Sequence, residues 1–179
     1  MSAAMKTILV IGGTGGIGEA FARRWHTQGK KIILTGRREK RLKQIQNDLP
    51  GCEILVMDNS DLTSLPQKVK DITSKFPALD TVWVNSGIQK TYQVGQQLPF
   101  LALQDQVVML MIVQIDDPST SSDKAIADEI TTNVTAPMIL GRLFMPHLIN
   151  VGGTFMITSS GLAFVPMGIY PTCEYLVLV

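Results

Sequence analysis

The sequence has few cysteines, few histidines and almost no net charge. Two cysteines in 179 residues, Cys52 and Cys173, are too few for a disulfide framework and too far apart for a pair of metal-binding thiolates. The two histidines, His26 and His147, have no second metal-ligating residue at helical spacing, so we predict no metal site. A net charge of +1, without a basic run that includes aromatics, argues against nucleic-acid binding.

Long apolar runs are also lacking. The run 7–11 after the polar N-terminus is too short, and too closely followed by glycines, for a signal peptide. The apolar residues of 98–115 are interrupted by Pro99 and by the polar residues 104–106, whereas a membrane span needs about twenty largely apolar residues. We therefore expect a cytoplasmic protein outside the membrane. Its content of 45% apolar and 17% charged residues is typical of one globular domain, here 1–179.

The sequence does contain an alternation of short apolar runs and amphipathic segments. Apolar, β-branched runs predict buried strands at 8–11, 31–34, 53–57, 81–84 and 154–158. Apolar residues at helical spacing predict helices at 17–28, 39–49, 65–76 and 122–148. Repeated β/α units predict an α/β fold with a doubly wound parallel sheet of the Rossmann type. The apolar segment 94–115 interrupts this alternation, either as an additional buried strand or helix or as a translated intervening sequence.

A glycine-rich segment, 12–18, lies between the first predicted strand and the first predicted helix. Two dinucleotide-binding spacings fit it, one through glycines 13, 15 and 18 and one through glycines 12, 16 and 18. Glycines there let the backbone turn tightly and bring a helix N-terminus beside a pyrophosphate, although a turn without a ligand is the alternative. The predicted cofactor-binding residues of this segment are Gly12, Thr14, Gly15, Gly16, Ile17 and Gly18.

The end of the second predicted strand indicates which dinucleotide is bound. Gly36 stands where an NAD site has an acidic side chain for the ribose 2′-hydroxyl, and Arg37 and Arg38 follow it. A guanidinium group matches the geometry of a 2′-phosphate, so the sequence favours NADP(H) over NAD(H). The alternative is a pair of solvated arginines at the start of a helix.

Five features come in the order and context typical of short-chain dehydrogenases, and the chain resembles that family from about Thr7 to Pro171. They are the pattern Gly12-x-x-x-Gly16-Ile17-Gly18, Asp58 after the third strand, Asn85-Ser86-Gly87 after the fourth, Asn133, and Ser159-Ser160-Gly161. The segment 159–166 resembles the DltE-type subgroup most. Two departures are mild: Ile11 replaces a threonine, and Val84-Asn85-Ser86-Gly87 replaces Asn-Asn-Ala-Gly.

The resemblance implies further cofactor contacts. Asp58 would bind the adenine amino group, with Asn59 beside it, although a capped loop is the alternative for Asp58. Asn85, Ser86 and Gly87 would line the cofactor.

Carbonyl reduction in this family pairs hydride transfer with proton delivery from a tyrosine, whose pKa a nearby lysine lowers. A serine holds the substrate oxygen, and Ser160 fits that role, with Ser159 as its competitor. An asparagine anchors a water, and Asn133 fits because Pro137 cannot donate to its carbonyl in a helix. A kinked helix without a catalytic role is the alternative.

The tyrosine and lysine do not appear in the family's register. The tyrosine should fall near position 173, which is a cysteine, and Tyr170 is the remaining candidate for the acid, with Tyr175 on the other side. The residues four positions after these tyrosines are Glu174 and Val179, and the last lysine of the sequence is Lys124. A phenol near its ordinary pKa of about 10 is a poor proton donor and acceptor at neutral pH.

The sequence therefore predicts an NADP(H)-dependent oxidoreductase that acts on a small-molecule carbonyl/alcohol pair and is impaired by loss of the Tyr–Lys segment. We interpret the divergent tail 172–179 as a sign of a truncated or mis-spliced relative. One alternative is a non-catalytic module that binds dinucleotide, as a homo-oligomer or paired with a full-length relative. Another is a poorly folding gene product whose unfinished sheet leaves an apolar edge.

Overall fold

A computed structural model describes residues 5–89 and 123–159. The chain divides into two compact units, the first of which is Met1–Gly87 with Thr131–Thr158 and the second Ile88–Ile130 with Ser159–Val179. Helix α4 (Asp123–Ile130) belongs to the second unit, and all the other helices and strands given below belong to the first. The segments 94–115 and 172–179 lie outside the described residues, and the single domain stays a prediction.

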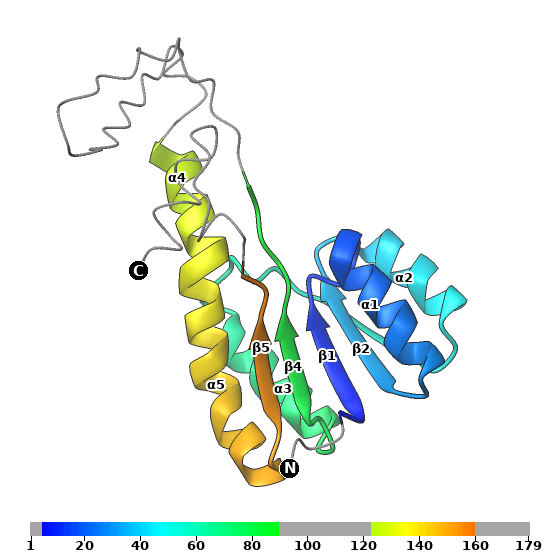
Figure 1. The fold of residues 1–179 in the computed structure, drawn as a ribbon. Helices are drawn as coiled ribbons and strands as arrows, with labels where there is room; N and C mark the ends of the chain where they lie inside the picture. Colours follow the sequence, from blue (N-terminus) through cyan, green and yellow to red (C-terminus); the bar gives the residue numbers. More distant parts are fainter. Residues whose placement is uncertain (1–4, 90–122, 160–179) are drawn as a thin grey trace, which may run out of the picture. The chain divides into compact units, whose positions relative to one another are not determined.

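The first unit is built on a parallel sheet whose strand order is β3-β2-β1-β4-β5 (Figure 1). The strands are β1 (Thr7–Ile11), β2 (Lys31–Gly36), β3 (Glu53–Val56), β4 (Thr81–Val84) and β5 (Thr154–Ile157). Every residue of β1 and β4 is buried, as expected for central strands covered on both faces. The chain reverses its direction of winding between β1 and β4, which is where open α/β sheets bind ligands.

Helices cover both faces of this sheet (Figure 1). Helices α1 (Gly16–Thr27) and α2 (Glu39–Asp48) pack on Ile8, Val10 and Trp83. Helices α3 (Leu65–Lys75) and α5 (Ala136–Val151) pack on the opposite face. Alternate residues of β1 enter the two cores because side chains alternate across a strand. The predicted doubly wound α/β fold is confirmed.

The predicted helix 122–148 differs from the observed one in its centre. A π-helical turn, η2 (Thr131–Thr135), follows α4 directly and leads into α5. Pro137, at the start of α5, has no N–H to donate to the carbonyl of Asn133, and a local π turn is a common way to accommodate such a break. The helix then runs to Val151, three residues beyond the expected end, and Gly152 closes it with a φ of 64°.

One helical run among the described residues, Asp123–Val151, has a length and mean hydropathy that would suffice to cross a membrane. Leu140, Phe144 and Leu148 of this run are buried against the sheet. Packing against the sheet therefore accounts for part of the apolar character of this run, while Met138, Met145 and Ile149 of the same run are exposed.

A network of four charged side chains joins α1 to α2. The carboxylate of Glu19 accepts hydrogen bonds from Arg41, at 2.7 and 2.8 Å, and from Arg23, at 2.9 and 3.0 Å. Arg23 also binds Asp48 at 2.8 Å. Burial disfavours the charged form of Glu19, but the hydrogen bonds from Arg41 and Arg23 outweigh it and hold the pKa of the carboxyl below its ordinary value.

This network predicts a pH-dependent contribution to stability. Because the folded-state pKa of Glu19 is lowered, its stabilisation is present at neutral pH and is lost as the pH falls from the ordinary value of 4.5 through the folded-state pKa. We expect Glu19→Gln to lower the free energy of unfolding by about 1–2 kcal/mol at pH 7 and by progressively less below pH 4.5. Urea denaturation across this range measures the difference. Glu39→Gln, which breaks an exposed pair with Lys43, is the control and should have a smaller effect.

Candidate nucleotide-binding site

The glycine-rich turn between β1 and α1 is held against the end of β2. The amides of Gly12 and Gly13 both donate to the carbonyl of Thr35, at 3.1 and 3.0 Å. Gly12 and Gly16 have φ angles of 90° and 55°, in the left-handed region that glycine adopts most readily. The turn therefore depends on glycine at both positions for its backbone conformation.

Gly18 is glycine because neighbouring atoms approach it closely, not because of its backbone angle. Close approach of neighbouring atoms is also a second reason for glycine at position 12. A Cβ at Gly12 would lie 2.6 Å from the amide nitrogen of Ser86. A Cβ at Gly18 would collide with the carbonyl oxygen of Gly12 and lie 2.7 Å from Nδ2 of Asn85. The close contacts at Gly13 and Gly15 are with the ends of the Leu34 and Arg38 side chains, whereas Gly12, Gly16 and Gly18 depend on backbone angle or on contact with backbone atoms. The structure therefore favours the spacing through glycines 12, 16 and 18.

The start of α1 is suited to an anion. Gly15 occupies the N-cap position and supplies no side-chain cap, so the first amides of this twelve-residue helix have no intrahelical acceptor. Such amides, together with the helix dipole, favour a phosphate group. Glu19 in the first turn would oppose an anion, but Arg23 and Arg41 neutralise its charge. The residues present fit the pyrophosphate of a dinucleotide.

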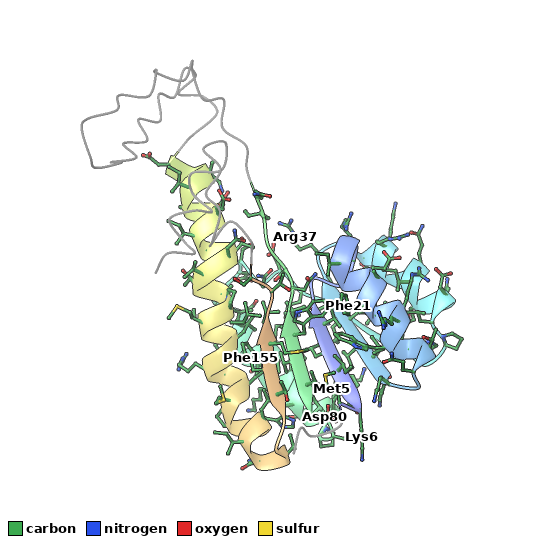
Figure 2. All side chains as sticks on the ribbon, viewed as in Figure 1. Met5, Lys6, Phe21, Arg37, Asp80 and Phe155 are labelled. Atoms are coloured by element: carbon green, nitrogen blue, oxygen red, sulfur yellow. The ribbon has the colours of Figure 1, made fainter. Side chains whose placement is uncertain are left out.

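The two arginines after β2 differ in their contacts. Arg38 donates through Nη2 to the carbonyl oxygen of Thr14, at 2.8 Å, and to its hydroxyl, at 3.1 Å. Arg37 is exposed, and within residues 5–89 and 123–159 its guanidinium makes no hydrogen bond or ion pair. Figure 2 shows Arg37 near the carboxyl ends of the strands, at the end of the sheet opposite Lys6 and Asp80.

Gly36 also has a steric reason to be glycine. A Cβ at this position would lie 2.6 Å from the Cγ2 methyl of Thr14. A carboxylate side chain of the kind that holds a ribose 2′-hydroxyl therefore requires Thr14 to move.

The ends of β3 and β4 carry the next group of predicted residues. Oδ1 of Asp58 accepts hydrogen bonds from the amide and the hydroxyl of Ser60, at 3.0 and 2.7 Å, so the loop cap is present. Its other oxygen, Oδ2, accepts no hydrogen bond from the part of the chain that the structure describes. Asn59 is buried and Ser86 is half-buried, and the buried atoms Nδ2 of Asn59 and Oγ of Ser86 have no partner among the described residues.

Asn85 has a clear structural role. Its amide donates to the carbonyl of Ile11 at 2.9 Å, its Nδ2 to Gly12 at 3.4 Å, and its Oδ1 accepts from Thr158 at 3.0 Å. These bonds tie together the ends of β1, β4 and β5. Gly87 lies close to the η2 turn, since a Cβ there would be 3.4 Å from Oδ1 of Asn133. Asn133 and Asn85–Gly87 thus lie at the same edge of the sheet.

The remaining catalytic predictions fall outside the described residues. Ser160, Tyr170 and Cys173 are not described, so their roles stay predictions. Ser159 follows Thr158, whose amide donates to the carbonyl of Val84 at 2.9 Å. In the described ranges, no group of three His, Cys, Asp or Glu side chains is placed to hold a metal ion.

Two contacts of this site have no signature in the sequence. Arg38 and Thr14 are 24 residues apart, and Thr158 and Asn85 are 73 apart. The sequence places each residue beside a strand end, and the carboxyl ends of parallel strands share one edge. It does not specify which side chains meet there.

The sequence matches the family profile described as short chain dehydrogenase over residues 6–172. It is 29% identical over 168 residues to the uncharacterized oxidoreductase DltE of Bacillus subtilis, covering 93% of this chain and 58% of that protein. It is also 29% identical to the short chain dehydrogenase/reductase dpfgG of Gibberella zeae, covering 88% of this chain and 52% of that protein. The chain thus spans between half and three fifths of the length of these relatives.

A solved structure shows the same fold. An alcohol dehydrogenase from the archaeon Thermococcus sibiricus, complexed with 5-hydroxy-NADP, superimposes with a TM-score of 0.77 at 19% identity. The match covers 98% of this chain and 66% of that one.

The close approach at Gly18 predicts an asymmetry between two helical glycines. We expect Gly18→Ala to lower the free energy of unfolding by about 1–3 kcal/mol, because its methyl group collides with the fixed carbonyl of Gly12. The matched control is Gly141→Ala in α5, where the new methyl group would lie 3.4 Å from the Phe155 ring. Alanine there should be neutral or should stabilise the helix by up to about 1 kcal/mol. Thermal unfolding of both variants measures this, and equal effects would contradict the packing argument.

Proposed function

The chain belongs to the short-chain dehydrogenase family, and from this premise we propose that it binds NADP(H) in preference to NAD(H) as a cytoplasmic oxidoreductase of a carbonyl/alcohol pair. The observation that carries the cofactor preference is the contrast at the end of β2. Arg37 has no partner among the described residues, and Gly36 offers no carboxylate. A 2′-phosphate supplies the anion that this guanidinium lacks, whereas a 2′-hydroxyl does not.

The other groups of the site support a dinucleotide along the edge of the sheet. The α1 N-terminus offers amides to a pyrophosphate, and Oδ2 of Asp58 offers an acceptor to the adenine amino group. Because Gly12, Gly16 and Gly18 have no side chains, a dinucleotide can approach the backbone of the turn closely, and Asn85 holds the turn in place. A bound nicotinamide cofactor supplies the hydride.

Three further residues are proposed to orient the substrate and to transfer the proton. Asn133 lies at the edge of the sheet beside Gly87, where it would anchor a water, and Ser160 would orient the substrate oxygen. Tyr170 is the candidate acid, but Glu174 stands where a lysine would lower its pKa. We therefore propose that this chain binds the cofactor but turns over slowly, because proton delivery is impaired.

We also propose a second function, because the residues predicted to bind the nucleotide and those predicted to transfer the proton lie in different parts of the chain. The predicted nucleotide-binding residues all lie before Ile88, whereas Glu174 and Val179 stand where the family's lysine would follow Tyr170 and Tyr175. The alternative proposal is a non-catalytic module that binds NADP(H) as a homo-oligomer or with a longer relative. Binding alone does not distinguish these proposals, whereas the turnover of the unmodified chain does, because a non-catalytic module has none.

The cofactor preference is tested by calorimetry with NADPH and NADH. We expect tighter binding of NADPH, and Arg37→Ala should weaken NADPH binding by about 10- to 100-fold because a charge-assisted contact to the 2′-phosphate is lost. Binding of NADH should change little. Arg24→Ala, an exposed arginine at the far end of α1, is the control for net charge and should leave both affinities unchanged. Equal affinity of the wild-type chain for both cofactors would refute the preference.

Proton delivery is tested by a repair rather than by a deletion. Cys173→Tyr combined with Val177→Lys places a tyrosine and a lysine in the family's register. We expect NADPH oxidation with a panel of carbonyl compounds to rise by about 10²–10⁴-fold over the unmodified chain. NADPH affinity should not change, and Cys173→Tyr alone is the control that lacks the cation. Equal turnover by the unmodified and repaired chains would show that the acid lies elsewhere, and Tyr170→Phe would then test the remaining candidate.

A further inference from the structure

Arg38 contacts one residue of the glycine-rich turn through several hydrogen bonds. Its Nη2 donates to the main-chain carbonyl of Thr14 at 2.8 Å and to the hydroxyl at 3.1 Å, and its Nε lies 3.4 Å from the same hydroxyl. Thr14 is 9% exposed and lies in the middle of the turn. The start of α2 is thereby bonded to the turn that precedes α1.

Two glycines make room for this contact. A Cβ at Gly15 would lie 2.9 Å from Nη2 of Arg38, and a Cβ at Gly36 would lie 2.6 Å from Cγ2 of Thr14. Gly15 has an extended backbone with a φ of 176°, so it has no conformational need for glycine. The guanidinium of Arg38 occupies the space beside it, so a side chain at this position would displace the flexible end of Arg38.

The neighbouring arginines are used differently. Arg41 binds Glu19, which lies in the first turn of α1. Arg37 has no partner within residues 5–89 and 123–159. Adjacent arginines that look equivalent in the sequence therefore differ in the structure, since one is engaged with the protein and the other is not.

We propose that Arg38 is a positioning residue that fixes the glycine-rich turn through Thr14, and that Arg37 alone discriminates between NADPH and NADH. The Thr14 carbonyl accepts a hydrogen bond from the Arg38 guanidinium, which ties this carbonyl to the start of α2. The positive charge of Arg38 also offsets the partial negative charge of the carbonyl, which lies next to the anion-binding amides of α1. This contribution is the same whether the ribose carries a 2′-phosphate or a 2′-hydroxyl. The proposal rests on the proposed function, because it takes a dinucleotide as the ligand of this turn.

The first test compares the affinities of the 179-residue chain for NADPH and NADH by calorimetry. Arg38→Ala should weaken both by the same factor, about 5- to 30-fold, and leave their ratio unchanged. Arg37→Ala should reduce the ratio. Lys40→Ala, which removes an exposed charge in the first turn of α2, is the matched control and should do neither. If Arg38→Ala weakens NADPH alone, Arg38 is a phosphate ligand and the proposal is wrong; no effect on either cofactor overturns it too.

The second test needs no cofactor and separates positioning from general stability. In the ligand-free chain, Arg38→Ala should speed amide hydrogen exchange of residues 13–18 by about tenfold, while the amides of β1 and β4 exchange as in wild type. Faster exchange throughout the sheet, or none in the turn, would contradict the proposal. If Arg38→Ala does not fold, Arg38→Lys retains the charge but not the forked contact and should give a smaller increase in the same residues. Failure of the wild-type chain to bind either dinucleotide would refute the proposed function, and the exchange experiment would still decide the role of Arg38.

Discussion

The arrangement of the candidate site depends on the close contact between the glycine-rich turn and the start of the β4 loop. Gly12 lies against the backbone of Ser86, and Gly18 lies against the carbonyl of Gly12, so neither position has room for a Cβ. This contact sets how near α1 comes to the switch point between β1 and β4. The bonds of Asn85 to Gly12 and of Gly12 to Thr35 then fix the turn from two neighbouring strands. A shift at Gly12 would move the α1 amides and the contacts of Arg38 together.

Much of this fold could be predicted from the sequence because central parallel strands are covered on both faces. The runs 8–11 and 82–84 are continuously apolar for that reason, and glycines or prolines follow most of the helices between strands. The π turn at Thr131–Thr135 was not predicted, although Pro137 indicated a break. The missing N–H of Pro137 predicts a local change in helix geometry, but more than one such change can accommodate the proline. Surrounding packing selects among them.

The site was predictable as a set of residues but not as a set of contacts. Both glycine spacings fit the sequence, and the choice followed only from the φ angles of Gly12 and Gly16 and from the contacts of Gly18. Arg37 and Arg38 look alike in the sequence, yet only Arg38 reaches Thr14. Asp58 was open between a loop cap and an adenine ligand, and the two roles turn out to be compatible, because the cap uses one carboxylate oxygen. Each outcome depends on side-chain direction, which composition and spacing do not encode.

The residues proposed to bind the nucleotide and those proposed to transfer the proton lie in different parts of the chain, and this separation bears on how the proposed function could change. The turn, Arg37, Arg38 and Asn85 all precede Ile88, and Arg38 and Asn85 hold the turn through bonds within the first unit. None of those bonds involves the residues after Thr158 that the proton-transfer proposal needs. A change confined to the Tyr–Lys register therefore removes a cation that lowers a phenol pKa without removing any contact to a pyrophosphate or a 2′-phosphate. Loss of the Tyr–Lys pair alone can therefore abolish turnover and leave the proposed cofactor site intact. An impaired reductase and a non-catalytic binding module would then differ only in proton delivery.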